Sequence, residues 1–166
     1  MDESGRKFLV DAMLGKLTRF LRIFGYDTIY ANDLEIIYNI KPIPDEMLLE
    51  YAKENKRIII TRDYPFYKKI QDQSVYLEGR GITNYLKQLK QKLDLNYEFQ
   101  IKKARCSICN SEIKRIPRSK AKKYIKPKIL DYVDEFYQCK NPDCQKIFWK
   151  GSHIEDIMKK LKEIKE

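Results

Sequence analysis

Short apolar runs alternate with amphipathic stretches from Phe8 onward. The apolar runs predict strands at residues 8–10, 28–31, 57–61 and 74–77. Leucines at helical spacing, and an apolar face that follows Asp45, predict helices near residues 14–24, 45–56 and 86–93. Because units of strand, helix and strand build mainly parallel sheets, we expect an α/β fold with a parallel central sheet.

The pattern changes near residue 97, where short apolar strands surround two pairs of cysteines. We expect a small β-rich ribbon here, followed by a C-terminal helix that packs back on the body. Ser152 and Glu155 form a capping-box signature ahead of that helix. Its apolar stripe consists of Ile154, Ile157, Met158, Leu161 and Ile164. The predicted division is an α/β domain at 1–95, a ribbon at 96–150 and a helix at 151–166.

The four cysteines form a pattern typical of a structural zinc site. Cys106 and Cys109 are spaced C-x2-C, and Cys139 and Cys144 are spaced C-x4-C. Each pair can present two thiolates to one tetrahedral ion, and four sulfur ligands leave no open position for catalysis. Two other interpretations stay open: reduced pairs without a metal, and a redox dithiol at Cys106 and Cys109.

Three aspartates occupy positions where parallel sheets carry chemistry. Asp11 and Asp63 follow predicted strands, and Asp45 begins a predicted helix. Residues beyond the carboxyl ends of parallel strands converge in one crevice, and clustered carboxylates suit Mg²⁺ or Mn²⁺. We predict that these three residues are both metal ligands and catalytic residues for phosphodiester cleavage. Taken one at a time, each can equally be a helix or turn cap.

The charge favours a polyanionic partner, usually a nucleic acid. Lys and Arg total 34 against 24 Asp and Glu, a formal net charge of +10. Residues 102–128 hold eleven basic residues and one acid, so the rest of the chain is about neutral. From this cluster we predict nucleic-acid contacts by Lys114, Arg115, Arg118, Lys120, Lys122 and Lys123. A solvated lysine-rich surface is the ordinary alternative.

A second basic strip lies next to the predicted acidic site. Lys16, Arg19 and Arg22 recur every three residues on the helix after Asp11, and Arg62 precedes Asp63. We predict that these four side chains bind the phosphates that flank a cut, although a solvated helix face explains the spacing of the first three equally well. No apolar run is long enough to cross a bilayer, so we expect a cytoplasmic protein without a membrane partner.

Several segments resemble a known family. FLVDAMLGKL from Phe8, LRIFGYD from Leu21, and Thr61-Arg62-Asp63 resemble the Mut-seven C-terminal RNase domain family, as do the cysteine pairs and FWKGSH from Phe148. The resemblance covers nearly the whole chain. It implies a PIN-like nuclease domain followed by a zinc ribbon, and hence a metal-dependent ribonuclease.

The resemblance also bears on the individual acids. Asp11 and Asp63 match the first and last acidic positions of PIN domains, and the helix that begins at Asp45 is similar to the PIN helix that carries an aspartate. A middle glutamate typical of many PIN enzymes has no clear counterpart. Two alternatives to an RNA-cleaving enzyme therefore stay open: a non-catalytic RNA-binding protein, for example one associated with the ribosome or with RNA processing, and a nuclease that acts on DNA.

Overall fold

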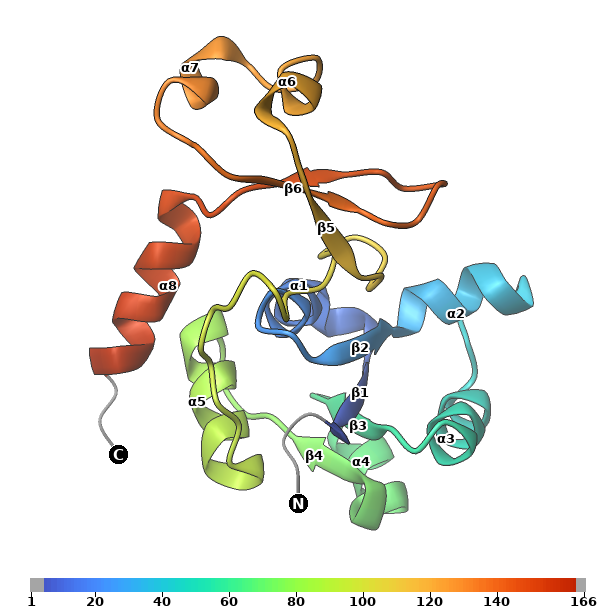
Figure 1. Ribbon diagram of the computed structural model, residues 1–166. Helices are drawn as coiled ribbons and strands as arrows, with labels where there is room; N and C mark the ends of the chain where they lie inside the picture. Colours follow the sequence, from blue (N-terminus) through green and yellow to red (C-terminus); the bar gives the residue numbers. More distant parts are fainter. Residues whose placement is uncertain (1–4, 164–166) are drawn as a thin grey trace.

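The structure, a computed structural model, describes residues 5–163, without the side chains of Ser152, His153 and Glu163. The chain forms an α/β body with a four-stranded parallel sheet, next to a smaller ribbon with an antiparallel sheet (Figure 1). The α/β class, the parallel sheet and the small β-rich ribbon predicted from the sequence are therefore confirmed.

The four strands of the body end at one edge of the sheet. They are β1 (Lys7–Val10), β2 (Asp27–Tyr30), β3 (Ile58–Thr61) and β4 (Ser74–Tyr76), in the order β2-β1-β3-β4. Every neighbouring pair is parallel, and Leu9 lies opposite both Ile29 and Ile59. The residues that follow β1 and β3 consequently emerge at the same edge.

Helices cover both faces of this sheet. One layer contains a 3-10 turn (Ala12–Leu14), α1 (Gly15–Ile23) and α5 (Ile82–Leu93). The other contains α2 (Ala31–Tyr38), α3 (Asp45–Glu54), α4 (Tyr64–Ile70) and a 3-10 turn (Gln71–Gln73). The alternation along β1 explains the two layers, because Phe8 and Val10 belong to the core on the α1 side and Leu9 to the core on the α3 side.

The ribbon extends away from the body (Figure 1). Its antiparallel strands are β5 (Ile113–Ile116), β6 (Phe136–Cys139) and β7 (Ile147–Phe148), and two short helices, α6 (Arg118–Ala121) and α7 (Pro127–Leu130), join β5 to β6. Phe136 is fully buried in a small apolar core of the ribbon, with Trp149 packed against it. The ribbon therefore has a modest apolar core in addition to its two cysteine pairs.

The last helix, α8 (Ser152–Glu163), returns to the body beside α5 (Figure 1). Ile154 and Ile157 are buried in the same core as Leu86 and Leu89 of α5. Ile164, the last member of the predicted stripe, lies outside the described residues. The exact limits of the three predicted segments stay a prediction. No helix in the part of the chain described has the length and apolar character needed to cross a membrane.

Candidate functional site

Asp11 lies at the carboxyl edge of the sheet, directly after β1, and only 9% of it is exposed. Its Oδ1 accepts a hydrogen bond from the Met13 amide at 2.8 Å. Its Oδ2 accepts from the Thr61 hydroxyl and from the Arg62 amide. Three of about four lone-pair positions on this carboxylate are therefore used, which fixes its orientation and leaves room for one further contact.

Asp63 comes from the neighbouring strand. Its own amide donates to the Thr61 hydroxyl oxygen at 2.9 Å, and its Oδ1 accepts from the Phe66 amide at 3.1 Å. The second contact is an N-cap, because Asp63 precedes the first turn of α4. Asp63 therefore does cap a helix, which was one of the two roles considered from the sequence. The cap holds its exposed carboxylate at the same edge as Asp11.

Asp45 is the exposed first residue of α3, after Pro44. Partial burial, followed by the negative charges of Asp63, Glu46 and Asp11, raises the pKa of Asp45 above its ordinary value of 3.8. Asp45 therefore lies in the field of the other two aspartates. Among the described residues, the only His, Cys, Asp or Glu group with all ligand atoms within 4.8 Å is the set of four cysteines, so the three carboxylates are more widely spaced.

Two residues that the sequence did not single out belong to this edge. Thr61 is fully buried and links Asp11 to Asp63 through one hydroxyl. Tyr30 ends β2, and its hydroxyl donates to the Ala12 carbonyl at 2.6 Å. Burial and then the charges of Asp11 and Asp33 raise the pKa of Tyr30. A polar residue at the end of an apolar strand was the available signal for Thr61.

A group of three tyrosines adjoins Asp63. Tyr64 follows it in the sequence and is 49% exposed. Its ring centroid lies 5.2 Å from that of Tyr76 and 6.3 Å from that of Tyr67, and the Lys68 ammonium lies 5.5 Å from its centre. The result is a supported aromatic surface beside an exposed carboxylate.

The predicted basic strip is only partly at the surface. Lys16 and Arg19 are exposed on α1, and Arg62 is half-buried with its guanidinium 5.7 Å from the Tyr85 ring centre. The prediction of phosphate contacts by Lys16, Arg19 and Arg62 is compatible with these positions and stays a prediction.

Arg22 requires a correction. It is 3% exposed, and its guanidinium donates to the Thr28 carbonyl at 2.8 Å and to the Ser107 and Ile108 carbonyls at 3.1 Å. The fourth partner is Asp33, in an ion pair at 2.9 Å. The regular spacing with Lys16 and Arg19 suggested a solvated cation, but Arg22 instead joins the body to the cysteine loop and is not available to a phosphate.

The four cysteine side chains converge as the spacing predicts. The sulfurs of Cys106 and Cys144 are 3.7 Å apart and those of Cys109 and Cys139 are 3.4 Å apart. Four sulfurs around a tetrahedral zinc, at about 2.3 Å each, would be about 3.8 Å apart, whereas a disulfide needs about 2.05 Å. The group can therefore hold a zinc ion.

The thiols differ in how readily they form the thiolate that would bind a metal. Burial raises the pKa of Cys106, and it is the main cause that raises the pKa of Cys139 to about 11. Burial would also raise the pKa of Cys109, but hydrogen bonds involving Ser111, Cys139 and Asn141 outweigh it and lower the value to about 6. Zinc binding would deprotonate the buried thiols and release their protons.

The loop from Cys106 to Asn110 is attached to the edge strand β2. Beside Arg22, the buried Asn110 accepts from the Thr28 amide at 3.0 Å and donates to Asp27 at 2.7 Å. Asp27 is also paired with Arg57 at 2.8 Å. A polar network therefore connects the cysteine site with the sheet, which the sequence pattern did not reveal.

The predicted nucleic-acid contacts of the ribbon all lie at the surface. Two are on β5, two are on α6 and two follow α6, and every one is exposed: Lys114, Arg115, Arg118, Lys120, Lys122 and Lys123. Arg115 approaches Glu135 at 3.8 Å, an exposed ion pair that contributes little to stability. Their binding role stays a prediction.

Comparison with known proteins identifies one family. The family model described as the Mut7-C RNase domain matches residues 6–161, nearly the whole chain. No curated protein and no solved structure matches. The match includes Asp11, Asp45 and Asp63 as well as all four cysteines. The chain therefore belongs to the Mut7-C RNase domain family, which points to a ribonuclease-related role.

Proposed function

We propose that this protein is a metal-dependent ribonuclease, acting as an endonuclease, whose catalytic edge is formed by Asp11, Asp45 and Asp63. The observation that carries the proposal is the Thr61 hydroxyl, which connects Asp11 and Asp63 at the edge where parallel strands assemble active sites. Membership of an RNase family supports RNA as the substrate.

The donor set fits a hard cation such as Mg²⁺ or Mn²⁺. Burial is the main cause of the raised pKa of Asp45, and the negative charges of Asp63, Glu46 and Asp11 add to it. A cation would relieve the repulsion between the carboxylates. The wide spacing is compatible with Mg²⁺, which usually takes one or two carboxylates and keeps several waters. When bound, the cation would polarise the scissile phosphate and lower the pKa of an attacking water.

The residues of the chain have distinct tasks in this mechanism. Thr61 and the Arg62 amide orient Asp11, so its remaining lone pair points in a fixed direction. The N-cap at α4 orients Asp63. The exposed cations Lys16 and Arg19 lie on the helix that follows Asp11, where they would bind phosphates on either side of the cut.

The zinc ribbon would aid RNA binding. With one structural zinc held by Cys106, Cys109, Cys139 and Cys144, the ends of the segment that carries α6 and α7 are fixed together. This segment presents the exposed basic residues of the ribbon, and such contacts contribute sequence-independent affinity for a phosphate backbone.

A cleavage assay with and without EDTA tests the proposal. Asp63→Asn should abolish cleavage of single-stranded RNA and retain RNA binding, because asparagine still caps a helix. Asp72→Asn is the matched control, since exposed Asp72 precedes β4 at the opposite end of the sheet. Cleavage by Asp63→Asn at the wild-type rate would refute the assignment, and a parallel DNA substrate would decide between the two nucleic acids.

One observation favours a second candidate, a non-catalytic RNA-binding or RNA-processing protein that is associated, for example, with the ribosome. Within the described residues the carboxylates do not form a compact ligand group, whereas the cysteines do. In that case wild-type protein would bind RNA with a steep salt dependence and show no EDTA-sensitive cleavage.

A further inference from the structure

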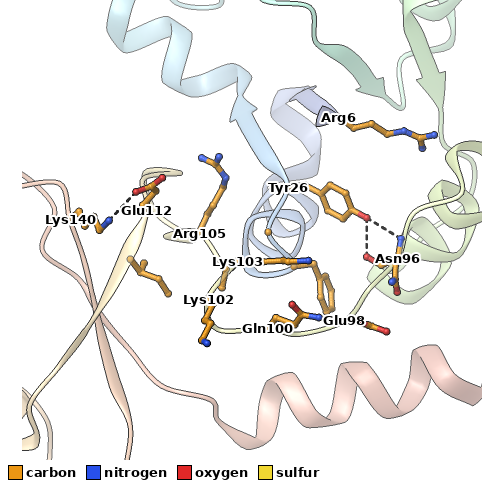
Figure 2. A pocket seen from close by; sticks show the side chains of 14 residues that line it. Arg6, Tyr26, Asn96, Glu98, Gln100, Lys102, Lys103, Arg105, Glu112 and Lys140 are labelled. Carbon is orange, nitrogen blue, oxygen red and sulfur yellow. Dashed lines mark hydrogen bonds and ion pairs between the residues drawn. The ribbon is translucent and has the colours of Figure 1, made fainter. Parts of the chain in front are cut away.

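A cavity of about 540 Å³ lies between the body and the ribbon (Figure 2). Arg6 and Tyr26, which line it, precede β1 and β2, whereas Asp11 follows β1. Asp11 lies five positions after Arg6 in the chain, so the two ends of the strand are roughly 16 Å apart. The cavity is therefore distinct from the proposed catalytic site.

Its lining is rich in cations. Five basic residues contribute to it: Arg6, Lys102, Lys103, Arg105 and Lys140. The two acids of the lining are already engaged by side chains: Glu112 pairs with Lys140 at 3.0 Å, and Glu98 accepts from Gln100 at 3.1 Å (Figure 2). The cavity thus has an excess of positive charge.

Arg6 supplies an independent indication of a ligand. Its Nη1 atom is buried and has no hydrogen-bond partner among the described residues. A buried cationic donor without a partner is unfavourable. Because Arg6 lines the cavity, an anion bound there would offset its positive charge through space. Exposed Lys102 and Lys103 also line the cavity, and neither forms an ion pair within residues 5–163.

The walls of the cavity are held in place by backbone contacts. Gly25 has a φ of +94°, and a Cβ there would lie 3.0 Å from the Lys103 carbonyl oxygen. The Arg105 amide donates to the Arg22 carbonyl at 2.8 Å, and Tyr26 exchanges two hydrogen bonds of 2.9 Å with the Asn96 backbone (Figure 2). A preformed site of this kind costs little ordering on binding.

We propose that this cavity binds phosphate groups of an RNA segment that lies outside the cleavage site. Lys102, Lys103 and Arg105 begin the basic segment that leads to Lys114 and Arg115 on β5, and Ile113, the first residue of β5, also lines the cavity. A backbone that crosses the cavity would therefore meet further cations on the ribbon. The choice of RNA as the ligand rests on the proposed function. Recognition of phosphate rests on the cations of the lining alone, and a free nucleotide could also supply the phosphate.

The test is RNA binding in EDTA, where cleavage does not interfere. Lys102→Ala/Lys103→Ala should weaken binding of a long single-stranded RNA about tenfold and lower the dependence of log Kd on log salt by about 1 to 2. Lys87→Ala/Lys90→Ala is the matched control, because it removes the same charge from exposed positions on α5. Equal losses in both variants would refute a specific site.

Two further measurements complete the test. Arg6→Gln should weaken RNA binding without lowering Tm; a lower Tm with unchanged affinity would overturn the ligand role of Arg6. Calorimetry with adenosine monophosphate distinguishes an RNA backbone from a free nucleotide as the source of the phosphate. If Lys102→Ala/Lys103→Ala abolishes binding of the nucleotide but leaves RNA affinity unchanged, the cavity is a nucleotide site and the RNA proposal is wrong. If the wild type binds RNA through the cavity but never cleaves it, only the proposed catalytic function fails.

Discussion

At the carboxyl ends of β1 and β3, the Thr61 hydroxyl donates to Asp11 Oδ2, and the Thr61 hydroxyl oxygen accepts from the Asp63 amide. One side chain on β3 thus fixes a carboxylate that follows β1. The contact explains how a polar residue can be fully buried at the end of a strand that otherwise consists of isoleucines.

Thr61→Val should lower the free energy of unfolding by about 1 to 3 kcal/mol, because it removes one of the two donors to the buried Asp11 Oδ2 and leaves the Asp63 amide without its partner. Cleavage should fall with it, since Asp11 loses its orientation. Denaturant unfolding and the EDTA-controlled assay measure the two effects. Thr61→Ser keeps the hydroxyl and should retain most of both.

Thr18→Val is a control for the chemistry of that change. Thr18 is also buried, but its hydroxyl donates to the Leu14 carbonyl and not to an aspartate. This variant should leave cleavage at the wild-type level. Normal cleavage by Thr61→Val as well would contradict the role of Thr61.

Tyr64 should contribute to RNA affinity by stacking on a base. Its exposed ring is braced by Tyr67 and Tyr76, and one stacked base is worth about 1 to 3 kcal/mol. Tyr64→Ala should therefore weaken binding of single-stranded RNA, measured by fluorescence polarisation, while Tyr64→Phe keeps the stacking surface and the affinity. Tyr38→Ala is the control, because Tyr38 is 42% exposed at the last position of α2 and lies outside the ribbon. Similar affinities for Tyr64→Ala and wild type would exclude stacking.

Arg22 and Arg19 should behave in opposite ways when replaced by methionine. Arg22→Met removes a buried guanidinium from Asp33 and three carbonyls, so it should cost more than about 2 kcal/mol of stability. Arg19→Met should leave the unfolding free energy within about 0.5 kcal/mol and reduce RNA binding. A folded Arg22→Met protein with wild-type stability would contradict the joining role of Arg22.

The sequence predicted the strands and their terminal aspartates because apolar runs of β-branched residues have few alternatives. It failed at α2 and α4, which we did not expect as helices. In α2 the apolar pattern misleads, since Ile36 and Ile37 are 82% and 65% exposed. The helix α4 is only seven residues long and contains Pro65 in its first turn.

In the candidate site, too, the sequence predicted some features and missed others. Spacing alone predicted the convergence of the cysteines, because two pairs sharing one ion is a local rule repeated twice. The burial of Arg22 could not be predicted, since its partners Ser107 and Ile108 lie more than eighty residues away in the chain. Periodicity on one helix gives no information about a distant loop that covers it.

The Asp27 network should give the protein a pH-dependent contribution to stability. Burial would raise the pKa of Asp27, but hydrogen bonds from Arg57 and Asn110 lower it below its ordinary value of 3.8. A lowered pKa in the folded state means that the stabilisation is complete above pH 3.8 and is lost as the pH falls through the folded value.

Asp27→Asn should therefore cost about 2 to 4 kcal/mol near neutral pH, because Arg57 loses its partner. The difference from wild type should shrink below pH 3.8. Urea unfolding at a series of pH values measures it, with exposed Asp131→Asn as control. A constant difference down to the lowest pH at which both proteins fold would contradict the assignment.

Zinc should stabilise more than the ribbon. Purified protein should contain one zinc per chain, and a chelator or Cys106→Ser should weaken RNA binding and loosen the loop from Cys106 to Asn110. The Thr28 amide reports this directly, because its hydrogen bond goes to Asn110. Zinc removal should speed hydrogen exchange at Thr28, on the edge strand, and leave the amides that join β1 to β3 protected.

Since β2 has the cysteine loop on its outer side and β1 on its inner side, selective exchange at Thr28 would separate attachment of the loop from global unfolding. Equal acceleration on all strands would instead mean that the ion holds the whole fold, and no change at Thr28 would exclude coupling between the zinc site and the sheet.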